Sequence, residues 1–144
     1  ADMGNAVFVA AMLELPTMAF FTKMSEKINC GTLIKFSILM FVVKHALTYF
    51  ATNMIMIYLA QVCQMFAYAL FVPASVYYVN EKIAVADRVK GQSLVTTSMT
   101  LSGVFANFAG GIMLDALGVG HVLLAGVILS IVGAVIVILT TEKV

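Results

Sequence analysis

Apolar residues run along this chain in five long stretches, which short polar or charged segments separate. The stretches cover residues 3–24, 32–51, 54–79, 91–114 and 119–140. An α-helix needs about 20 mostly apolar residues to cross a bilayer, and each stretch meets that length. The pattern therefore predicts an all-α protein, a polytopic transmembrane helix bundle with five spanning helices.

No formal charge separates the second stretch from the third, because none occurs between His45 and Glu81. The two stretches must nevertheless be separate helices. At about 1.5 Å per residue this run is too long for a single crossing. Thr52-Asn53 is the best turn signal within it. The other predicted connections are a polar segment at 25–31, a charged loop at 80–90 and a tight turn at 115–118.

The composition also departs from that of a soluble domain. The 144 residues are 62% hydrophobic and 10% charged, whereas about 25% of residues are charged in soluble domains. The net charge of +1 gives no electrostatic case for nucleic acid as a partner, and the expected surrounding is the lipid bilayer. Cys30 and Cys63 lie far apart and indicate neither a disulfide framework nor a metal site. Nucleophile–base, metal-ligand and phosphate-loop patterns are missing from the sequence, so we expect no enzyme and no cofactor.

Lysine and arginine mark which ends of the helices face the cytoplasm. They occur around the first connection, in the loop at 80–90 and at Lys143, whereas the turns near residues 52 and 117 contain none. With five crossings, this distribution predicts a multi-pass cell-membrane protein, in bacteria an inner-membrane one. Its amino end would lie outside and its carboxyl end in the cytoplasm.

Two charged residues, Glu14 and Lys44, fall inside predicted spans. A charge at the bilayer centre costs about 2.5–3.5 kcal/mol on insertion scales, and such residues usually face a bundle interior or a watery cavity. Counted from the first connection, both lie roughly 15–20 Å from the same membrane face. They can therefore meet as a proton-sensitive ion pair, in which moving the cation changes the protonation of the carboxyl group. The alternative is a static structural ion pair.

The third stretch carries polar side chains that form a stripe. Gln61, Gln64 and Tyr68 share one face of a helix by three-four spacing. This stripe predicts hydrogen bonds to a hydroxylated solute, and hydrogen bonds between helices are the alternative.

Three further residues stand out inside predicted spans. Asn107 needs a partner for its amide within a bilayer, and it lies among small residues of 91–114 that let helices approach closely. Pro16 and Pro73 each remove a helical hydrogen bond, which predicts a kink near each proline.

Several short motifs, in their order and spacing, resemble the carboxyl-terminal half of a major facilitator superfamily transporter, helices eight to twelve of twelve. Glu14-Leu15-Pro16 resembles the Glu-x-Pro of helix eight, and Met24 to Gly31 resembles the short basic loop that follows it. Lys90-Gly91-Gln92, Gly103 and the run from Gly110 to Gly118 resemble helix eleven and its exit. The branch that the residues resemble most is that of the lactose permease-like and nucleoside-permease-like proton symporters.

The resemblance implies a role for two positions. Lys44 falls where this branch has an Arg in helix nine, and Gln64 falls where it often has a His in helix ten. Lys44 keeps the charge without the bidentate fork of arginine, and Gln64 lacks a titratable ring. Both residues depart from the usual coupling arrangement of the branch, and coupling through Glu14 is the alternative that stays open. The resemblance also implies that helices eight and eleven contact the other half of the transporter.

These observations favour part of a secondary active transporter that moves a small polar solute by alternating access around a midplane site. A sugar or nucleoside carried with protons is the favoured cargo. Glu14 and Lys44 would form the coupling centre, and Gln61, Gln64, Tyr68 and Asn107 would line the solute path. We expect the chain to be a fragment whose partners are helix seven and the amino-terminal half of the same transporter. The alternative is a non-transporting membrane subunit or assembly module whose buried charges dock a partner.

Overall fold

The computed structural model describes residues 2–142, with side chains among residues 2–13 described only at positions 4, 8, 11 and 12. Within these residues the chain is entirely helical, which confirms the predicted fold class. There are five α-helices and one 3-10 turn. They are α1 (Asp2–Ser25), α2 (Cys30–Tyr49), α3 (Met54–Lys82), η1 (Val85–Asp87), α4 (Arg88–Leu117) and α5 (Val119–Thr140).

The helices extend past the apolar stretches at the charged loop. α3 continues through Lys82, and α4 begins at Arg88 and continues through Asp115. Hydropathy marks the part of a helix that suits lipid, whereas backbone hydrogen bonds continue into the interfacial region. At the opposite end, the break between α2 and α3 is capped by Asn53, whose side-chain oxygen accepts a hydrogen bond of 3.0 Å from the backbone N–H of Met56.

The prediction of five membrane spans is too high for the described residues. Four helical segments are long and apolar enough to cross a membrane, namely α2, α3, Val85–Leu117 and α5. α1 is not among them, although its 24 residues are long enough. Its apolar residues are divided by Glu14 and followed by Thr22 and Lys23, and much of its first half lies outside the described side chains.

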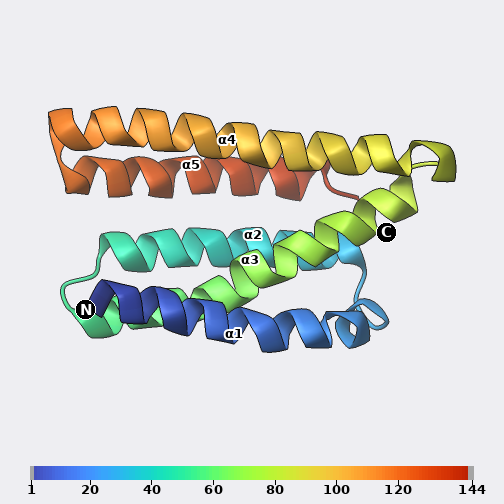
Figure 1. Cartoon of the computed structure of the whole chain (residues 1–144), viewed down its shortest axis with the longest axis horizontal. Coiled ribbons are helices and arrows are strands. Elements are labelled where there is room, and N and C mark those ends of the chain that lie inside the picture. The colour runs from blue at the N-terminus through green and yellow to red at the C-terminus, as the bar shows by residue number, and fades with distance from the viewer. Residues whose placement is uncertain (1, 143–144) are drawn as a thin grey trace.

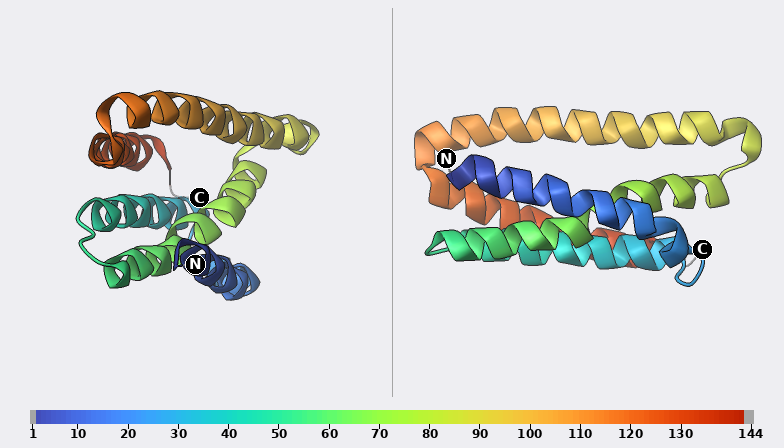
Figure 2. Two further views of the ribbon diagram at one scale, coloured as in Figure 1. Left: turned by 60° about the vertical axis from the view of Figure 1, so that its left-hand side comes forward. Right: turned by 60° about the horizontal axis from the view of Figure 1, so that its bottom comes forward.

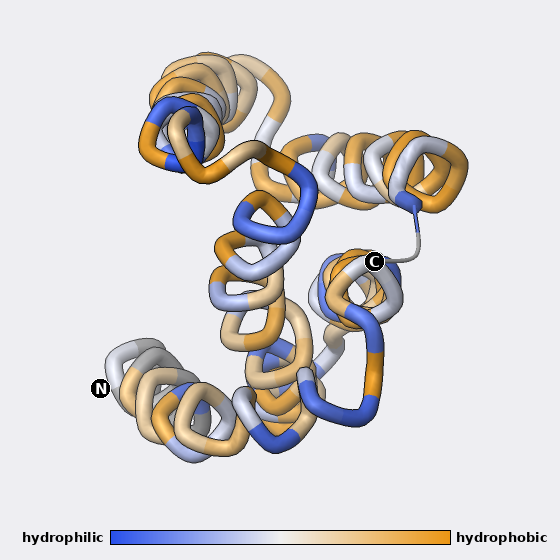
Figure 3. The backbone as a smooth tube through the Cα atoms, turned by 90° about the vertical axis from the view of Figure 1, so that its right-hand side faces the viewer, coloured by the Kyte–Doolittle hydropathy of each residue, from blue (hydrophilic) through white to orange (hydrophobic). Residues whose placement is uncertain are grey.

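The helices form two groups, joined by α3 (Figure 1). α1, α2 and α3 pack together, while α4 and α5 lie side by side and α5 packs on α2. α3 runs diagonally from the first group to the start of α4, as the turned views also show (Figure 2). The α1–α2 loop and the α3–α4 loop lie at the same end of the molecule, where hydrophilic residues gather (Figure 3).

The core lies between α1, α2 and α3, at the end of the bundle nearer those two loops. Phe21, Leu33, Ile34, Leu70 and Ala74 form its buried cluster, against which Val137 of α5 also packs. Alanines on α3 are fully buried at positions 60, 67, 69 and 74, and such small residues let helices approach closely where lipid is the alternative solvent. α1 continues as a helix through Pro16, and α3 continues through Pro73.

α3 and α4 approach most closely at Gly91. A Cβ atom there would lie 2.5 Å from Cδ1 of Ile83 and 2.9 Å from Cγ1 of Val79. Beside it, Nε2 of Gln92 donates a hydrogen bond of 2.8 Å to the carbonyl oxygen of Val76. Gly91 is also the one buried residue of α4 among those described. The absence of a side chain at this position therefore sets how α4 leaves α3.

The substitution Gly91→Ala should lower the stability of the chain, because the new methyl group has to displace Ile83 and Val79. Overpacking of this kind costs about 1–3 kcal/mol. Gly103→Ala is the matched control, since a Cβ atom there meets nothing within 4 Å. Thermal unfolding of both variants in detergent tests this, and an equal loss of stability in the two would contradict it.

Candidate functional site

The three helices of the first group are joined by hydrogen bonds at Gln64. Nζ of Lys44 on α2 donates to Oε1 of Gln64 on α3 at 2.5 Å. Nε2 of the same amide donates to Oε1 of Glu14 on α1 at 3.3 Å. All three side chains are half-buried. Glu14, Lys44 and Gln64, which the sequence analysis selected from three different segments, therefore form one continuous polar network.

Gln64 lies between the two charges, where the sequence analysis expected them to meet directly. Among the described residues the ion pairs are Lys82–Glu142 and Lys90–Asp87. The amide presents its carbonyl oxygen to the ammonium group of Lys44 and its N–H to the carboxyl group of Glu14. A primary amide suits this position, because it can donate and accept at once. Hydrogen bonds to ionised groups are also stronger than those between neutral groups.

The backbone around Lys44 is held by its own helix. Oγ1 of Thr48 donates a hydrogen bond of 2.9 Å to the carbonyl oxygen of Lys44. His45, the next residue, has its Nδ1 atom 2.8 Å from the carbonyl oxygen of Phe41 and stacks on the Phe41 ring. Its ring also reaches α5, since a Cβ atom at Gly126 would lie 3.4 Å from His45 Cδ2. His45 therefore packs toward α5 while Lys44 reaches α3.

The other candidate solute-path residues lie outside this network. Gln61 is half-buried and takes part in none of the hydrogen bonds given for the described residues. Tyr68 is 43% exposed. Asn107 is exposed, and its Nδ2 atom donates to the carbonyl oxygen of Gly103 at 2.8 Å, so the amide is partnered by its own helix. Shared spacing along α3 thus places Gln61 and Gln64 on one face, while only Gln64 reaches the charges.

Sequence reasoning missed a contact between α3 and Glu142, the second residue after α5. Lys82 forms an ion pair with Glu142, and Tyr78, one turn earlier, accepts a hydrogen bond of 3.3 Å from the backbone N–H of Glu142. The hydrogen bond from Lys82 lowers the pKa of the Glu142 carboxyl. Tyr78 and Lys82 are four residues apart, which is the spacing that could have indicated a shared partner.

Neither cysteine has a bonded partner, and the described residues contain no group of three His, Cys, Asp or Glu side chains that could hold a metal ion. The chemistry available at the network is hydrogen bonding and proton exchange at a carboxyl group inside a helix bundle.

A family model for the Major Facilitator Superfamily matches residues 1–144, the whole of the chain. The chain belongs to this superfamily. No curated protein and no solved structure matches it.

Membership in the Major Facilitator Superfamily places the chain among membrane transporters and explains its four apolar helices. It is also a family of transporters, not of enzymes. In this bundle, one acid, one base and one amide form a half-buried polar network between three helices.

Gln64→Leu should destabilise the packing of α1 against α2 and α3, because both charges lose their bridging partner. We expect the free energy of unfolding to fall by about 1–3 kcal/mol. Gln61→Leu is the matched control, being the same substitution one turn earlier on α3 without a hydrogen bond to lose. Unfolding in mixed micelles measures both, and a control as damaging as Gln64→Leu would show that the network contributes little.

Proposed function

We propose that the chain is part of the carboxyl-terminal six-helix bundle of a twelve-helix secondary active transporter. It would move a small polar solute by alternating access, driven by protons, with a sugar or nucleoside as the favoured cargo. The proposed branch of the superfamily is the lactose permease-like and nucleoside-permease-like one. Superfamily membership supports the transporter class. The observation that carries the coupling mechanism is the Lys44–Gln64–Glu14 network.

The network suits proton coupling because its charge balance changes with one proton. With Glu14 ionised, its negative charge offsets that of Lys44 across the Gln64 amide. Adding a proton to Glu14 leaves Lys44 as an uncompensated cation among three apolar helices, which is costly in a bilayer. An arrangement that opens the network to water or to a solute then becomes relatively more stable. Protonation and helix arrangement would thereby be coupled, and such coupling is reciprocal.

Three side chains outside the network supply polar groups for a solute path. The Gln61 side chain is partly exposed, and Tyr68 is 43% exposed. Asn107 uses one N–H within α4 and retains its amide oxygen and a second N–H. These groups could bind the hydroxyls of a sugar or a nucleoside.

The surface of α4 supports the proposal that helix seven and the amino-terminal half are the missing partners. Apart from Gly91, no described residue of α4 is buried in this structure. The exposed residues include Ser98, Ser102 and Asn107, which suit neighbouring helices better than lipid. In this proposal α4 would face the other half of the transporter.

The end of the molecule that carries both basic loops would face the cytoplasm. The α1–α2 loop holds Lys27, and the loop before α4 precedes Arg88 and Lys90. Both lie at the end where the described chain finishes (Figure 1). The positive-inside rule then puts the start of α1 outside the cell.

Uptake into proteoliposomes tests the coupling. The complete polypeptide that contains this chain would be assayed with sugars and nucleosides, with and without an inward proton gradient. Glu14→Gln should abolish gradient-driven accumulation, a loss of at least about tenfold, while exchange of solute across the membrane without a gradient continues. Glu142→Gln is the control, because it removes a carboxyl group that lies outside the bundle.

The outcomes separate the parts of this proposal. Accumulation that persists in Glu14→Gln would sink Glu14 as the coupling group and leave a transporter. Failure of the unmodified protein to take up any tested solute would favour a non-transporting membrane subunit whose charges dock a partner.

A further inference from the structure

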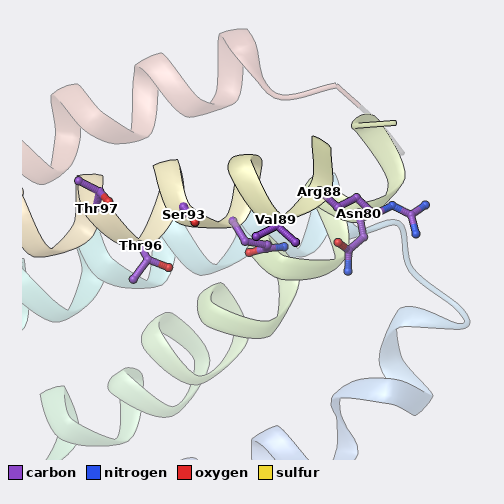
Figure 4. A pocket seen from close by; sticks show the side chains of 7 residues that line it. Asn80, Arg88, Val89, Ser93, Thr96 and Thr97 are labelled. Atoms are coloured by element: carbon purple, nitrogen blue, oxygen red, sulfur yellow. The ribbon is translucent and has the colours of Figure 1, made fainter. Parts of the chain in front are cut away.

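A hollow of about 490 Å³ lies between the end of α3 and the first three turns of α4. Asn80 contributes to it from α3, and Arg88, Ser93, Thr96 and Thr97 follow one another along α4 (Figure 4). Val89 and Gln92 complete its lining. None of these residues belongs to the proposed coupling centre or to the proposed solute path, so the proposed function gives the hollow no role.

The lining carries one positive charge and no carboxylate. Arg88 supplies the charge, and the other polar lining groups are amides and hydroxyls. The lysines nearest to it in sequence are paired, Lys82 with Glu142 and Lys90 with Asp87, and neither ion pair includes Arg88. The Nε atom of Arg88 is shielded from solvent without a hydrogen-bond partner among the described residues. Within the described residues, Arg88 is therefore a cation at the pocket without a carboxylate partner.

Three hydroxyl groups of α4, those of Ser93, Thr96 and Thr97, line the pocket. Deeper along the helix, Thr100 and Ser102 donate hydrogen bonds to carbonyl oxygens of their own helix, at 3.0 and 2.7 Å. The three pocket hydroxyls form no such bond within the described part of the chain, and neither does that of Ser98. They can therefore donate to an external acceptor.

The start of α4 adds to the positive potential at the Arg88 end of the hollow. Arg88 is the first residue of this 30-residue helix, and the side chain of Asp87 before it makes no capping hydrogen bond. The N–H groups of a first helical turn lack partners within the helix, and they favour a bound anion. A guanidinium group binds phosphate through charge-assisted hydrogen bonds.

The surroundings favour a phosphate that belongs to a lipid. Arg88 lies at one end of the candidate span Val85–Leu117, the level at which the phosphates of a bilayer lie. Val85, Val89 and Leu94 beside it are 74%, 77% and 69% exposed, so apolar surface surrounds the Arg88 end of the pocket. Ser93 to Thr97 lie about 7–14 Å deeper along the helix axis. A single phosphate bound at Arg88 does not reach this depth. The ester carbonyls of a phospholipid lie on this deeper side of its phosphate.

We propose that this pocket binds the phosphate of an anionic phospholipid, with Arg88 holding the phosphate and the hydroxyls of Ser93 and Thr96 donating to its ester carbonyls. The shared chemistry is a phosphate group, and free phosphate is the other possible source. A lipid held here would bridge α3 and α4 at the loop that joins the two helix groups. The inference is independent of any transport activity, because it concerns binding alone.

Binding of defined lipids to the complete polypeptide tests the proposal. The protein in neutral detergent would be titrated with phosphatidylglycerol, and the bound lipid counted by native mass spectrometry, with inorganic phosphate titrated in parallel. Arg88→Gln should weaken phosphatidylglycerol binding by about tenfold, which is the loss expected for one charge-assisted contact. Lys23→Gln removes a cation of α1 at the same end of the molecule. It should change phosphatidylglycerol binding by less than about twofold.

Further variants distinguish the sources and guard against misfolding. Thr96→Val should weaken the lipid a few-fold and leave inorganic phosphate unaffected, because only the lipid reaches that depth. Arg88→Lys keeps the charge without the fork and should fall between the unmodified protein and Arg88→Gln. Arg88-dependent binding of inorganic phosphate without lipid binding would overturn the lipid as ligand. Equal losses of phosphatidylglycerol binding in Arg88→Gln and Lys23→Gln would overturn the site, because binding would then depend on surface charge in general.

Discussion

A charged side chain inside a lipid bilayer has to find a partner, because hydrocarbon offers none. In this chain Glu14 and Lys44 meet that requirement through the amide of Gln64. Each residue comes from a different helix, so the requirement can be met only when α1, α2 and α3 pack against one another. The buried alanines of α3 allow the close approach that brings the three side chains together. Polar pairing and small-residue packing are thus two parts of one constraint.

The second group of helices, α4 and α5, contains no such polar network among the described residues, and more of its surface is exposed. α5 carries only apolar and small residues over most of its length and rests on α2. α4 is held at its start, where Gly91 lets it approach Val79 and Ile83, and along α5, while the rest of its surface is exposed. Two of its hydroxyls, those of Thr100 and Ser102, bond to its own backbone. This division suits a protein whose first group organises charge and whose fourth helix presents a surface to other helices.

Much of the fold could be predicted because bilayer thickness and hydropathy constrain helix positions strongly. The helical class followed from the length of the apolar stretches, and the break at Asn53 followed from length together with the Thr52-Asn53 turn signal. Superfamily membership followed from short motifs at fixed spacing. Helix ends could not be predicted as well, since Lys82 and Arg88 remain helical beyond the apolar part. Depth arithmetic placed Glu14 and Lys44 at one level, but it could not show that Gln64 lies between them, because that depends on how three helices rotate about their axes. For the same reason the partner of Asn107 within its own helix went unforeseen.

The identity of the bridging residue has a consequence for the proposed transport cycle. A histidine at position 64 could take up a proton itself and relay it between acid and base. Gln64 can only reorient its amide, so in the proposed cycle Glu14 takes up the proton. Coupling would then depend on a single carboxyl group whose charge is felt by Lys44 through the amide. Such a centre is simpler than one with a titratable bridge, and replacing Glu14 would remove the coupling while the surrounding helices keep their packing.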